Sequence, residues 1–233
     1  MDKHKPAEEA RFLEPRVTLR ERVRKNIKAA PKKLLPDGVL REVRRYRSCV
    51  GVERFLYLKI RVLNGIGLMD PKPSRLPSTA RSFVFVCFGN IMRSPMCEAL
   101  MNRALTAVPD KQIKVTSAGL NAAPGRAAHP WAVAAARELG ISLENHRAKL
   151  LTAEMVDQAD VIFAMDCQNQ VQLLSRYAHA KSKVFMLGAY AGEDCRPLEI
   201  HDPYYAGEEG TRECYKIVNT CIQNLVGTLF SER

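Results

Sequence analysis

The fold is decided by a stretch that begins like a strand and ends like a helix: Phe83-Val84-Phe85-Val86-Cys87-Phe88-Gly89-Asn90-Ile91-Met92-Arg93-Ser94-Pro95. Its first four residues are aromatic and β-branched, which is typical of a buried strand. Pro95 suits the first turn of a helix, because a helix leaves its first N–H groups without intrahelical partners. The stretch therefore predicts a strand, a short loop and a helix, with Cys87 at the end of the strand.

The chain that follows repeats this alternation of strand and helix. Further strand patterns lie at residues 113–116, 161–165 and 184–187, helical patterns fill the intervals, and a long helical pattern covers residues 208–230. Strands separated by helices pair in parallel through right-handed crossovers. We therefore predict an α/β fold, a doubly wound four-stranded parallel sheet flanked by helices, with the ligand at the carboxyl ends of the strands.

The positive charge is confined to the first third of the chain. Residues 1–80 contain 20 Lys and Arg against 9 Asp and Glu, whereas residues 81–233 contain 16 of each, so the net charge of +11 belongs to the first part. The proline-rich residues 71–78 cannot continue a helix and are typical of a linker. We predict a basic N-terminal extension over residues 1–80 and an α/β domain over residues 81–233.

Composition excludes several classes of protein. With 46% hydrophobic and 26% charged residues, the 233-residue chain is neither collagen-like, nor a disulfide scaffold, nor wholly disordered. No apolar run approaches the roughly 18 residues of a spanning helix, and the polar start of the chain predicts no secretory signal. Seven cysteines without a repeating spacing favour reduced thiols and a cytoplasmic location.

The extension itself has two parts. Residues 1–33 are rich in charge and poor in apolar residues, which predicts disorder. Residues 39–68 carry apolar residues at helical spacing with arginines around them, which predicts two amphipathic helices. Two interpretations stay open: the helices bind an anionic membrane surface or an acidic partner, which would make the protein peripheral to the membrane, or they pack on the α/β domain. Nucleic acid is not expected, because no base-stacking aromatic pattern accompanies the charge.

Cys87 and Arg93 are separated by five residues at the strand end. Such a loop can direct its backbone N–H groups inward, and Gly89 eases the turn. Inward amides and a helix N-terminus bind a tetrahedral dianion, and Arg93 adds a bidentate clamp. The same positive surroundings favour the thiolate of Cys87, a nucleophile for phosphoryl transfer.

Residues 86–95 resemble the phosphate-binding signature of low-molecular-weight protein tyrosine phosphatases. The resemblance covers about residues 82–232 and none of the basic part. Further motifs follow in the order of the family: Ser117-Ala118-Gly119, His146-Arg147, Ala159-Asp160, Met165-Asp166 and Asp202-Pro203-Tyr204-Tyr205.

The resemblance implies a role for each matching residue. Cys87 is the expected nucleophile that forms a cysteinyl-phosphate, Arg93 binds the phosphoryl group, and Asp202 is the general acid. Chemistry supports the last role independently, because a phenolate with a pKa of about 10 leaves faster when it is protonated. The expected phosphate-binding residues are Phe88, Gly89, Asn90, Ile91, Met92, Arg93 and Ser94.

Two further groups of residues follow from the resemblance. A polar network is expected to support the loop, with Ser94 also donating to the sulfur of Cys87; it consists of Asn90, Ser94, Ser117 and His146. An aromatic cleft is expected to flank the leaving group; it consists of Phe88, Tyr204 and Tyr205.

The predicted function is hydrolysis of phosphotyrosine in proteins, with neither a metal nor an organic cofactor. Two alternatives use the same fold. A protein-arginine phosphatase branch tends to place a small polar residue where this chain has Ile91. A thioredoxin-coupled arsenate reductase needs two further cysteines in a mobile segment, and the two on offer, Cys167 and Cys195, are 28 residues apart.

Overall fold

The structure is a computed structural model that describes residues 36–65, 76–107, 113–192 and 198–231. Its contacts divide the chain into one unit of residues 1–44 and another of residues 45–233. The predicted disorder of residues 1–33 lies outside the described residues, as do residues 66–68 of the second amphipathic segment and most of the predicted linker. The division between residues 80 and 81 stays a prediction.

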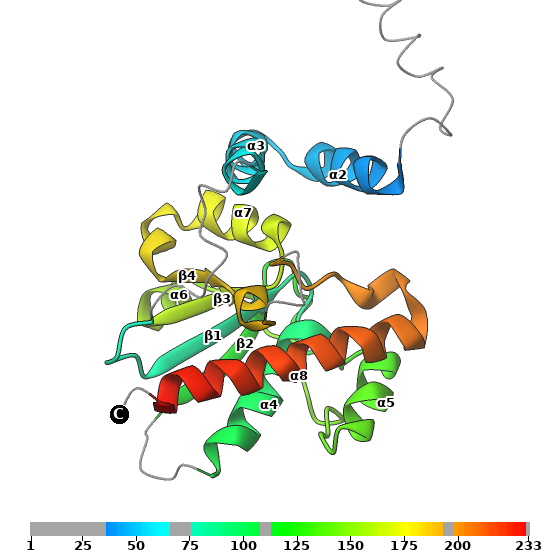
Figure 1. Ribbon diagram of the computed structural model, residues 1–233, viewed down its shortest axis with the longest axis vertical. Helices are drawn as coiled ribbons and strands as arrows, with labels where there is room; N and C mark the ends of the chain where they lie inside the picture. The colour runs from blue at the N-terminus through cyan, green and yellow to red at the C-terminus, as the bar shows by residue number, and fades with distance from the viewer. Residues whose placement is uncertain (1–35, 66–75, 108–112, 193–197, 232–233) are drawn as a thin grey trace, which may run out of the picture. The chain divides into compact units, whose positions relative to one another are not determined.

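Four parallel strands form the sheet at the centre of the larger unit (Figure 1). In the order β2-β1-β3-β4, β1 lies inside the sheet between β2 and β3. The strands are β1 (Ser82–Cys87), β2 (Lys114–Gly119), β3 (Val161–Ala164) and β4 (Val184–Met186). All pairs are parallel, which confirms the predicted α/β sheet.

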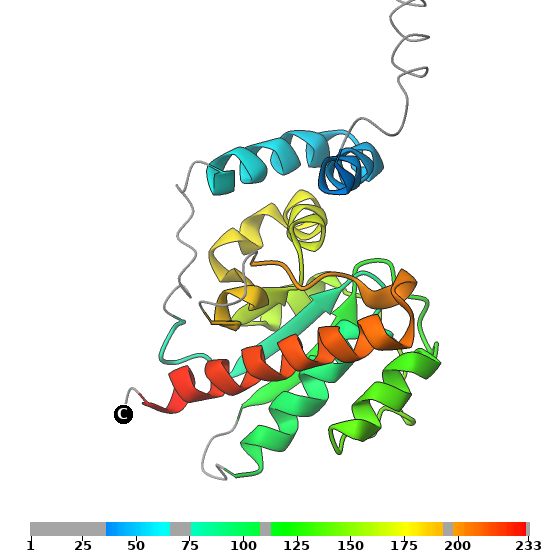
Figure 2. The same cartoon turned by 45° about the vertical axis from the view of Figure 1, so that its right-hand side comes forward.

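Helices cover both faces of the sheet (Figures 1 and 2). On one face lie α4, α5 and α8, and on the other lie α6 and α7. Their bounds are α4 (Arg93–Leu105), α5 (Pro130–Glu138), α6 (Ala153–Gln158), α7 (Cys167–Arg176) and α8 (Gly207–Ser231). Short 3-10 turns also occur: η1 (Ala178–Lys183), η2 (Leu187–Tyr190) and η3 (Pro203–Tyr205).

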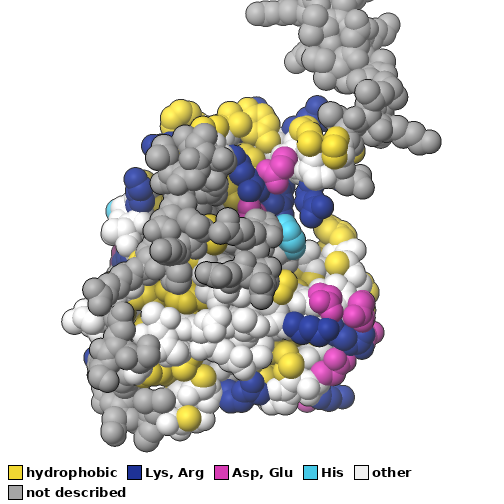
Figure 3. Space-filling model, in the orientation of Figure 1, with side chains coloured by type: hydrophobic (Ala, Val, Ile, Leu, Met, Phe, Trp, Pro, Cys, Tyr) yellow, Lys and Arg dark blue, Asp and Glu magenta, His cyan; other side chains and the backbone are white. Residues whose placement is uncertain are grey.

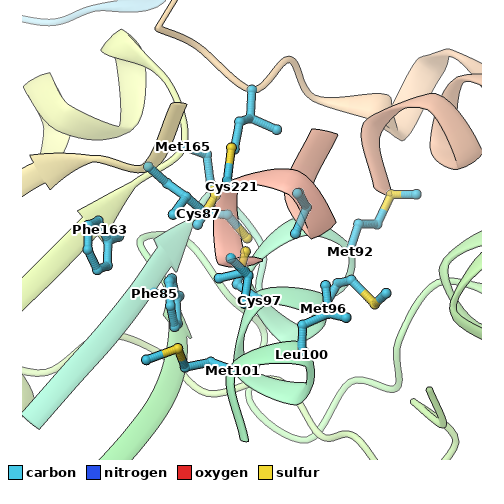
Figure 4. Close-up of a cluster of buried hydrophobic side chains, with 14 of the residues drawn as sticks. Phe85, Cys87, Met92, Met96, Cys97, Leu100, Met101, Phe163, Met165 and Cys221 are labelled. Carbon is cyan, nitrogen blue, oxygen red and sulfur yellow. The ribbon is translucent and has the colours of Figure 1, made fainter. Parts of the chain in front are cut away.

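Alternate residues of β1 face opposite helical layers, as the period of a strand requires. Phe83 and Phe85 belong to the core beneath α4 and α8, whereas Val84 and Val86 belong to the core beneath α6 and α7. Figure 4 shows the first of these cores, in which Phe85 and Phe163 stack with ring centroids 5.3 Å apart. The buried sheet thus fixes the position of Cys87, which is its last residue on β1.

Two helices lie in the predicted extension, α2 (Asp37–Ser48) and α3 (Val52–Gly65), and they are joined by a turn in which Gly51 has φ of 53°. Within the unit of residues 45–233, α3 packs its inner face against α7 (Figure 1). Tyr57 and Ile60 are buried there against Cys167 and Val171. Packing on the α/β domain, one of the two open interpretations, is therefore what α3 does. None of the helices in the described ranges is long and apolar enough to cross a membrane.

Candidate active site

The phosphate loop, residues 87–94, joins the end of β1 to the start of α4. It is enclosed from the β2 side by Gly119, where an added Cβ would lie 2.8 Å from the backbone nitrogen of Asn90. Any side chain at Gly119 would therefore push into the loop. The helix begins at Arg93, so Pro95 lies in its first turn.

The carbonyl groups of the phosphate loop are bound to the surrounding frame. Five of them accept hydrogen bonds of 2.7–3.0 Å from groups outside the loop: Cys87 from Leu120 N, Phe88 from Asn121 N, Asn90 from His146 Nε2, Ile91 from His129 N, and Met92 from Tyr215 Oη. Because each peptide unit directs its N–H away from its C=O, this frame favours N–H groups on the opposite side of the loop, and the N–H of Asn90 does point toward the sulfur of Cys87, at 3.2 Å. Such a set of amides, followed by a helix N-terminus, is suited to an anion.

Asn90 holds the loop in a conformation that few residues adopt. Its φ is 53°, in the left-handed region that asparagine tolerates better than most residues. The buried side chain donates to the hydroxyls of Ser94 at 2.9 Å and Ser117 at 2.8 Å. Its oxygen accepts from the backbone N of Lys149 at 2.7 Å. The four residues predicted to support the loop therefore do lie together around Asn90.

The sulfur of Cys87 is buried and has two hydrogen-bonding neighbours. The backbone N–H of Asn90 donates to it at 3.2 Å, and the hydroxyl of Ser94 lies 3.0 Å away. That hydroxyl is also 3.3 Å from the carbonyl of Ala118. A single hydroxyl proton can serve the sulfur or the carbonyl, so ionisation of Cys87 would turn Ser94 toward the sulfur.

Arg93 is buried between two carboxylates. Its Nη1 donates to Asp166 at 2.6 Å and to the carbonyl of Ile200 at 2.9 Å, and its Nη2 donates to Asp202 at 2.7 Å. Burial disfavours its charge, but Asp166 and Asp202 more than offset this effect and raise the pKa of Arg93 above its ordinary value. The guanidinium therefore stays charged and joins the phosphate loop to the segment that carries Asp202.

Asp202 belongs to the acid segment, residues 198–205, which passes the carboxyl ends of the strands. Its side chain is 44% exposed, and its second oxygen accepts from the backbone N of Tyr204 at 3.2 Å. Asp202 thus caps the 3-10 turn that follows and faces the phosphate loop through Arg93. The role of Asp202 as the general acid stays a prediction.

Aromatic side chains surround this edge of the sheet. Phe88 is 45% exposed directly after Cys87, and Tyr205 is 93% exposed. Tyr204 is partly buried, contacting Tyr205 edge-on at 5.0 Å and His129 edge-on at 5.5 Å. Tyr204 and Tyr205 lie directly after Asp202 on η3, and their part in an aromatic cleft with Phe88 stays a prediction.

Several residues of the site were missed or undervalued by the sequence reasoning. Asp166 both caps α7, through a 2.7 Å bond from Asn169 N, and binds Arg93. Asp166 directly follows β3 and so lies at the same edge of the sheet as Cys87, and this position could have identified it as a residue of the site. His129 and Tyr215 act through contacts over long sequence separations, for which the sequence offers no pattern.

No cluster of three or more His, Cys, Asp or Glu side chains suited to a metal occurs among the residues that the structure describes. Cys167 is buried at the start of α7, and Cys195 lies outside the described residues.

Known proteins share this domain. EpsP of Ralstonia nicotianae, described as a probable low molecular weight protein-tyrosine-phosphatase, is 37% identical over 53% of this chain and 79% of its own length. Wzb of Escherichia coli, a low molecular weight protein-tyrosine-phosphatase, is 30% identical over 65% of this chain and 97% of its own length. The solved structure of the YwlE arginine phosphatase from Geobacillus stearothermophilus is 32% identical, with a TM-score of 0.58 over 65% of this chain and 94% of that one.

The family model for the low molecular weight phosphotyrosine protein phosphatases matches residues 82–233. This range contains the sheet, the phosphate loop and Asp202, and it covers more than half of the chain. The relatives above support phosphatase activity for it. The chain therefore belongs to the low molecular weight phosphotyrosine protein phosphatase family.

Proposed function

We propose that the protein hydrolyses phosphotyrosine through a cysteinyl-phosphate on Cys87, with Asp202 as the general acid. The observation that carries the proposal is the 2.7 Å bond between Arg93 and Asp202, beside a sulfur that already faces two hydrogen-bonding groups. Phosphate ligand, nucleophile and proton donor thus meet at one edge of the sheet. These are the groups that aryl-phosphate hydrolysis requires.

In the first step, the thiolate of Cys87 attacks phosphorus while the bond from phosphorus to the phenolic oxygen breaks. Asp202 gives its proton to that oxygen, so phenol leaves and a thiophosphate ester remains. Arg93 and the amides of the phosphate loop stabilise the charge on the equatorial oxygens. A bound phosphoryl dianion would take Nη2 of Arg93 from Asp202, which frees the carboxyl group to face the leaving oxygen.

In the second step, Asp202 takes a proton from water as the water oxygen attacks phosphorus. The bond from sulfur to phosphorus breaks, inorganic phosphate leaves and the thiolate returns. Ser94 assists by donating its hydroxyl to the sulfur, from 3.0 Å.

The aromatic side chains favour an aryl phosphate over a guanidinium phosphate. Tyr204 and Tyr205 beside Asp202, together with the exposed Phe88, offer faces for a phenyl ring. Ile91 is buried and supplies no polar atom for a guanidinium. The similarity to an arginine phosphatase makes phosphoarginine the alternative substrate to exclude.

A steady-state assay with a phosphotyrosine peptide, phosphoarginine and arsenate tests this function, with Cys87→Ser as the blank. We expect kcat/KM to be highest with the phosphotyrosine peptide and Cys87→Ser to be inactive. Equal or faster turnover of phosphoarginine would overturn the substrate, and thioredoxin-dependent reduction of arsenate would overturn the reaction. Cys97→Ala, which removes a buried thiol one turn into α4, should keep its activity.

We further propose that the outer face of α3 binds an anionic membrane surface. While the inner face packs on α7, five large apolar side chains remain between 50% and 72% exposed: Val50, Val52, Phe55, Leu58 and Val62. Figure 3 shows hydrophobic side chains gathered where α3 lies. Arg54 and Lys59 of α3 are exposed as well. An apolar stripe with cations beside it matches an interface of anionic lipid.

Pelleting of the full chain with vesicles tests the membrane proposal. We expect binding to phosphatidylcholine vesicles that contain phosphatidylserine, weaker binding to phosphatidylcholine alone, and a loss of binding in Phe55→Asp/Leu58→Asp. Leu150→Asp, at an exposed leucine elsewhere on the domain, is the matched control and should still bind. Equal binding to both vesicles, or binding to polyglutamate only, would overturn the membrane as the partner.

A further inference from the structure

A buried carboxylate lies three residues before Asp202. The side chain of Glu199 is only 6% exposed and is paired with two arginines. Arg45 Nη1 donates to it at 3.0 Å, and Arg61 Nη1 forms a second ion pair with it. Both arginines come from residues 45–65, which precede the part of the chain that the family model matches.

The two arginines are held by their own surroundings. Arg61 lies over the ring of Tyr57, with 5.4 Å from Cζ to the centroid, and Tyr57 is buried against α7. The backbone carbonyl of Arg45 accepts from Ser48 Oγ at 2.7 Å, and Ser48 in turn accepts from Gln168 of α7 at 2.9 Å. The arginines thus present a fixed pair of charges to Glu199.

Glu199 is one of several points at which the acid segment is attached. Ile200 donates its N–H to Met165 at 2.8 Å and accepts from Arg93 at 2.9 Å. Leu198 lies very close to Gly188: a side chain at position 188 would collide with the backbone carbonyl of Leu198. Arg45 also approaches the ring of His201, with 3.4 Å between Nη2 and Nδ1. Residues 45–61 therefore contact the segment on both sides of Ile200, next to Asp202.

A buried carboxylate is unfavourable without its partners, so loss of the arginines would drive Glu199 toward water. Such a movement, three residues from Asp202, would shift the carboxyl group that must reach the leaving oxygen. Small displacements of a reacting group are costly, because the geometry of proton transfer is narrow.

We propose that Arg45 and Arg61 are positioning residues of the phosphatase, which hold Asp202 in place through Glu199. The N-terminal extension is then a part of the catalytic unit that sets the efficiency of general-acid catalysis. This inference rests on the proposed role of Asp202 as the general acid.

The test compares leaving groups, because only a proton-donation defect depends on them. Arg45→Ala/Arg61→Ala is assayed on phenyl phosphate, a poor leaving group, and on 2,4-dinitrophenyl phosphate, which needs no proton. We expect kcat/KM, which reports the step in which the phenol leaves and not the later attack of water, to fall about tenfold on the first and less than about twofold on the second. Glu199→Gln, which leaves the extension unaltered, should show the same selectivity.

Two controls separate positioning from general damage. Arg137→Ala removes an equally short arginine–glutamate pair, 2.7 Å to Glu144, on the surface of the domain and should change neither rate. In the background of Asp202→Ala, the double arginine substitution should add no further leaving-group selectivity, because the group that it positions is absent.

Equal losses on both substrates would overturn the inference, as would an undiminished effect in the Asp202→Ala background. Failure of the proposed function looks different. In that case the wild type itself would not hydrolyse the aryl phosphates, or Asp202→Ala would lose as much on dinitrophenyl phosphate as on phenyl phosphate.

Discussion

The phosphate loop and the acid segment face each other across Arg93, but they are held in different ways. Apart from Phe88 and Gly89, the loop is buried, with Cys87 only 3% exposed, and it is fixed by hydrogen bonds to β2, to α8 and to the connecting segments around residues 120, 129 and 147. The acid segment is attached at a few points, and the side chain of Asp202 is 44% exposed. Buried, fully satisfied networks are rigid, whereas sparsely attached segments open easily.

This difference assigns different tasks to the two regions. A preorganised loop binds the dianion and its transition state without reorganisation. In the proposed mechanism Asp202 releases Arg93 when substrate arrives, gives up a proton and then accepts one from water, and a partly exposed carboxylate can do so. Substitutions in the loop should therefore cost both stability and activity, and substitution of the partly exposed Asp202 should cost activity alone.

Asp202→Asn should have the largest effect on rate with the smallest effect on stability. Asparagine can still cap the turn at Tyr204 and accept from Arg93, but it carries no proton for the leaving group. We expect kcat for the phosphotyrosine peptide to fall by about 10²- to 10⁴-fold, with the free energy of unfolding changed by less than about 0.5 kcal/mol. Steady-state kinetics and urea denaturation measure the two quantities.

The control for this substitution is Asp157→Asn, at an exposed carboxylate that pairs with His179. It should leave kcat unchanged. A large loss of stability in Asp202→Asn would contradict the contrast between the two regions, and an equal loss of kcat/KM on dinitrophenyl phosphate would contradict the acid role.

Two substitutions of Asn90 test the phosphate loop. Asn90 stabilises the loop in two ways, through the hydrogen bonds of its side chain and through its left-handed backbone conformation. Asn90→Gly keeps the left-handed conformation but removes the buried hydrogen bonds, which should cost about 3 kcal/mol of unfolding free energy. Asn90→Ala loses the same bonds and also strains the backbone, which should cost about 1 kcal/mol more. Urea denaturation of both variants gives the difference.

Both variants should also lose phosphatase activity, since the loop that they loosen carries Cys87. If glycine and alanine were equally destabilising, the positive φ of Asn90 would contribute nothing. If neither variant lost stability, the phosphate loop would be no more firmly held than the acid segment.

The same contrast explains what could be predicted from the sequence. The sheet, its parallel order and the phosphate loop follow from local patterns, because residues 83–95 contain the strand, the turn and the helix start in one run. Cys87, Arg93 and Asn90 are within this run, so their proximity needed no tertiary information. Ser117 and Asp202 were assigned only through the order of the family motifs.

The attachment of the acid segment could not be predicted. Glu199 is separated from Arg45 by 154 residues, and no pattern pairs one glutamate with one arginine at that distance. The buried side of α3 could not be predicted either. Apolar residues on two sides of a helix indicate that it is partly buried, but they do not indicate which side is buried. Only the packing of Tyr57 and Ile60 against α7 shows which side of α3 is buried.

His129 lies between the two regions and offers the mildest test of their connection. Its backbone N–H donates to Ile91 in the phosphate loop at 2.9 Å, and its ring contacts Tyr204 in the acid segment. Burial, and to a lesser extent the charge of Arg126, lowers the pKa of His129 below its ordinary value of 6.5. The unfolded chain therefore takes up this proton at a higher pH than the folded one.

The stability that neutral His129 contributes is complete above pH 6.5 and decreases as the pH falls below it. His129→Asn should remove this dependence while keeping the cap of α5, since asparagine is also a good N-cap. We expect the free energy of unfolding to fall slightly more between pH 7.5 and about pH 5 in the wild type than in the variant. If the free energy of unfolding changed with pH equally in the wild type and the variant, the ring of His129 would titrate alike in the folded and unfolded chain. In that case only the backbone of His129 would link the phosphate loop to the acid segment.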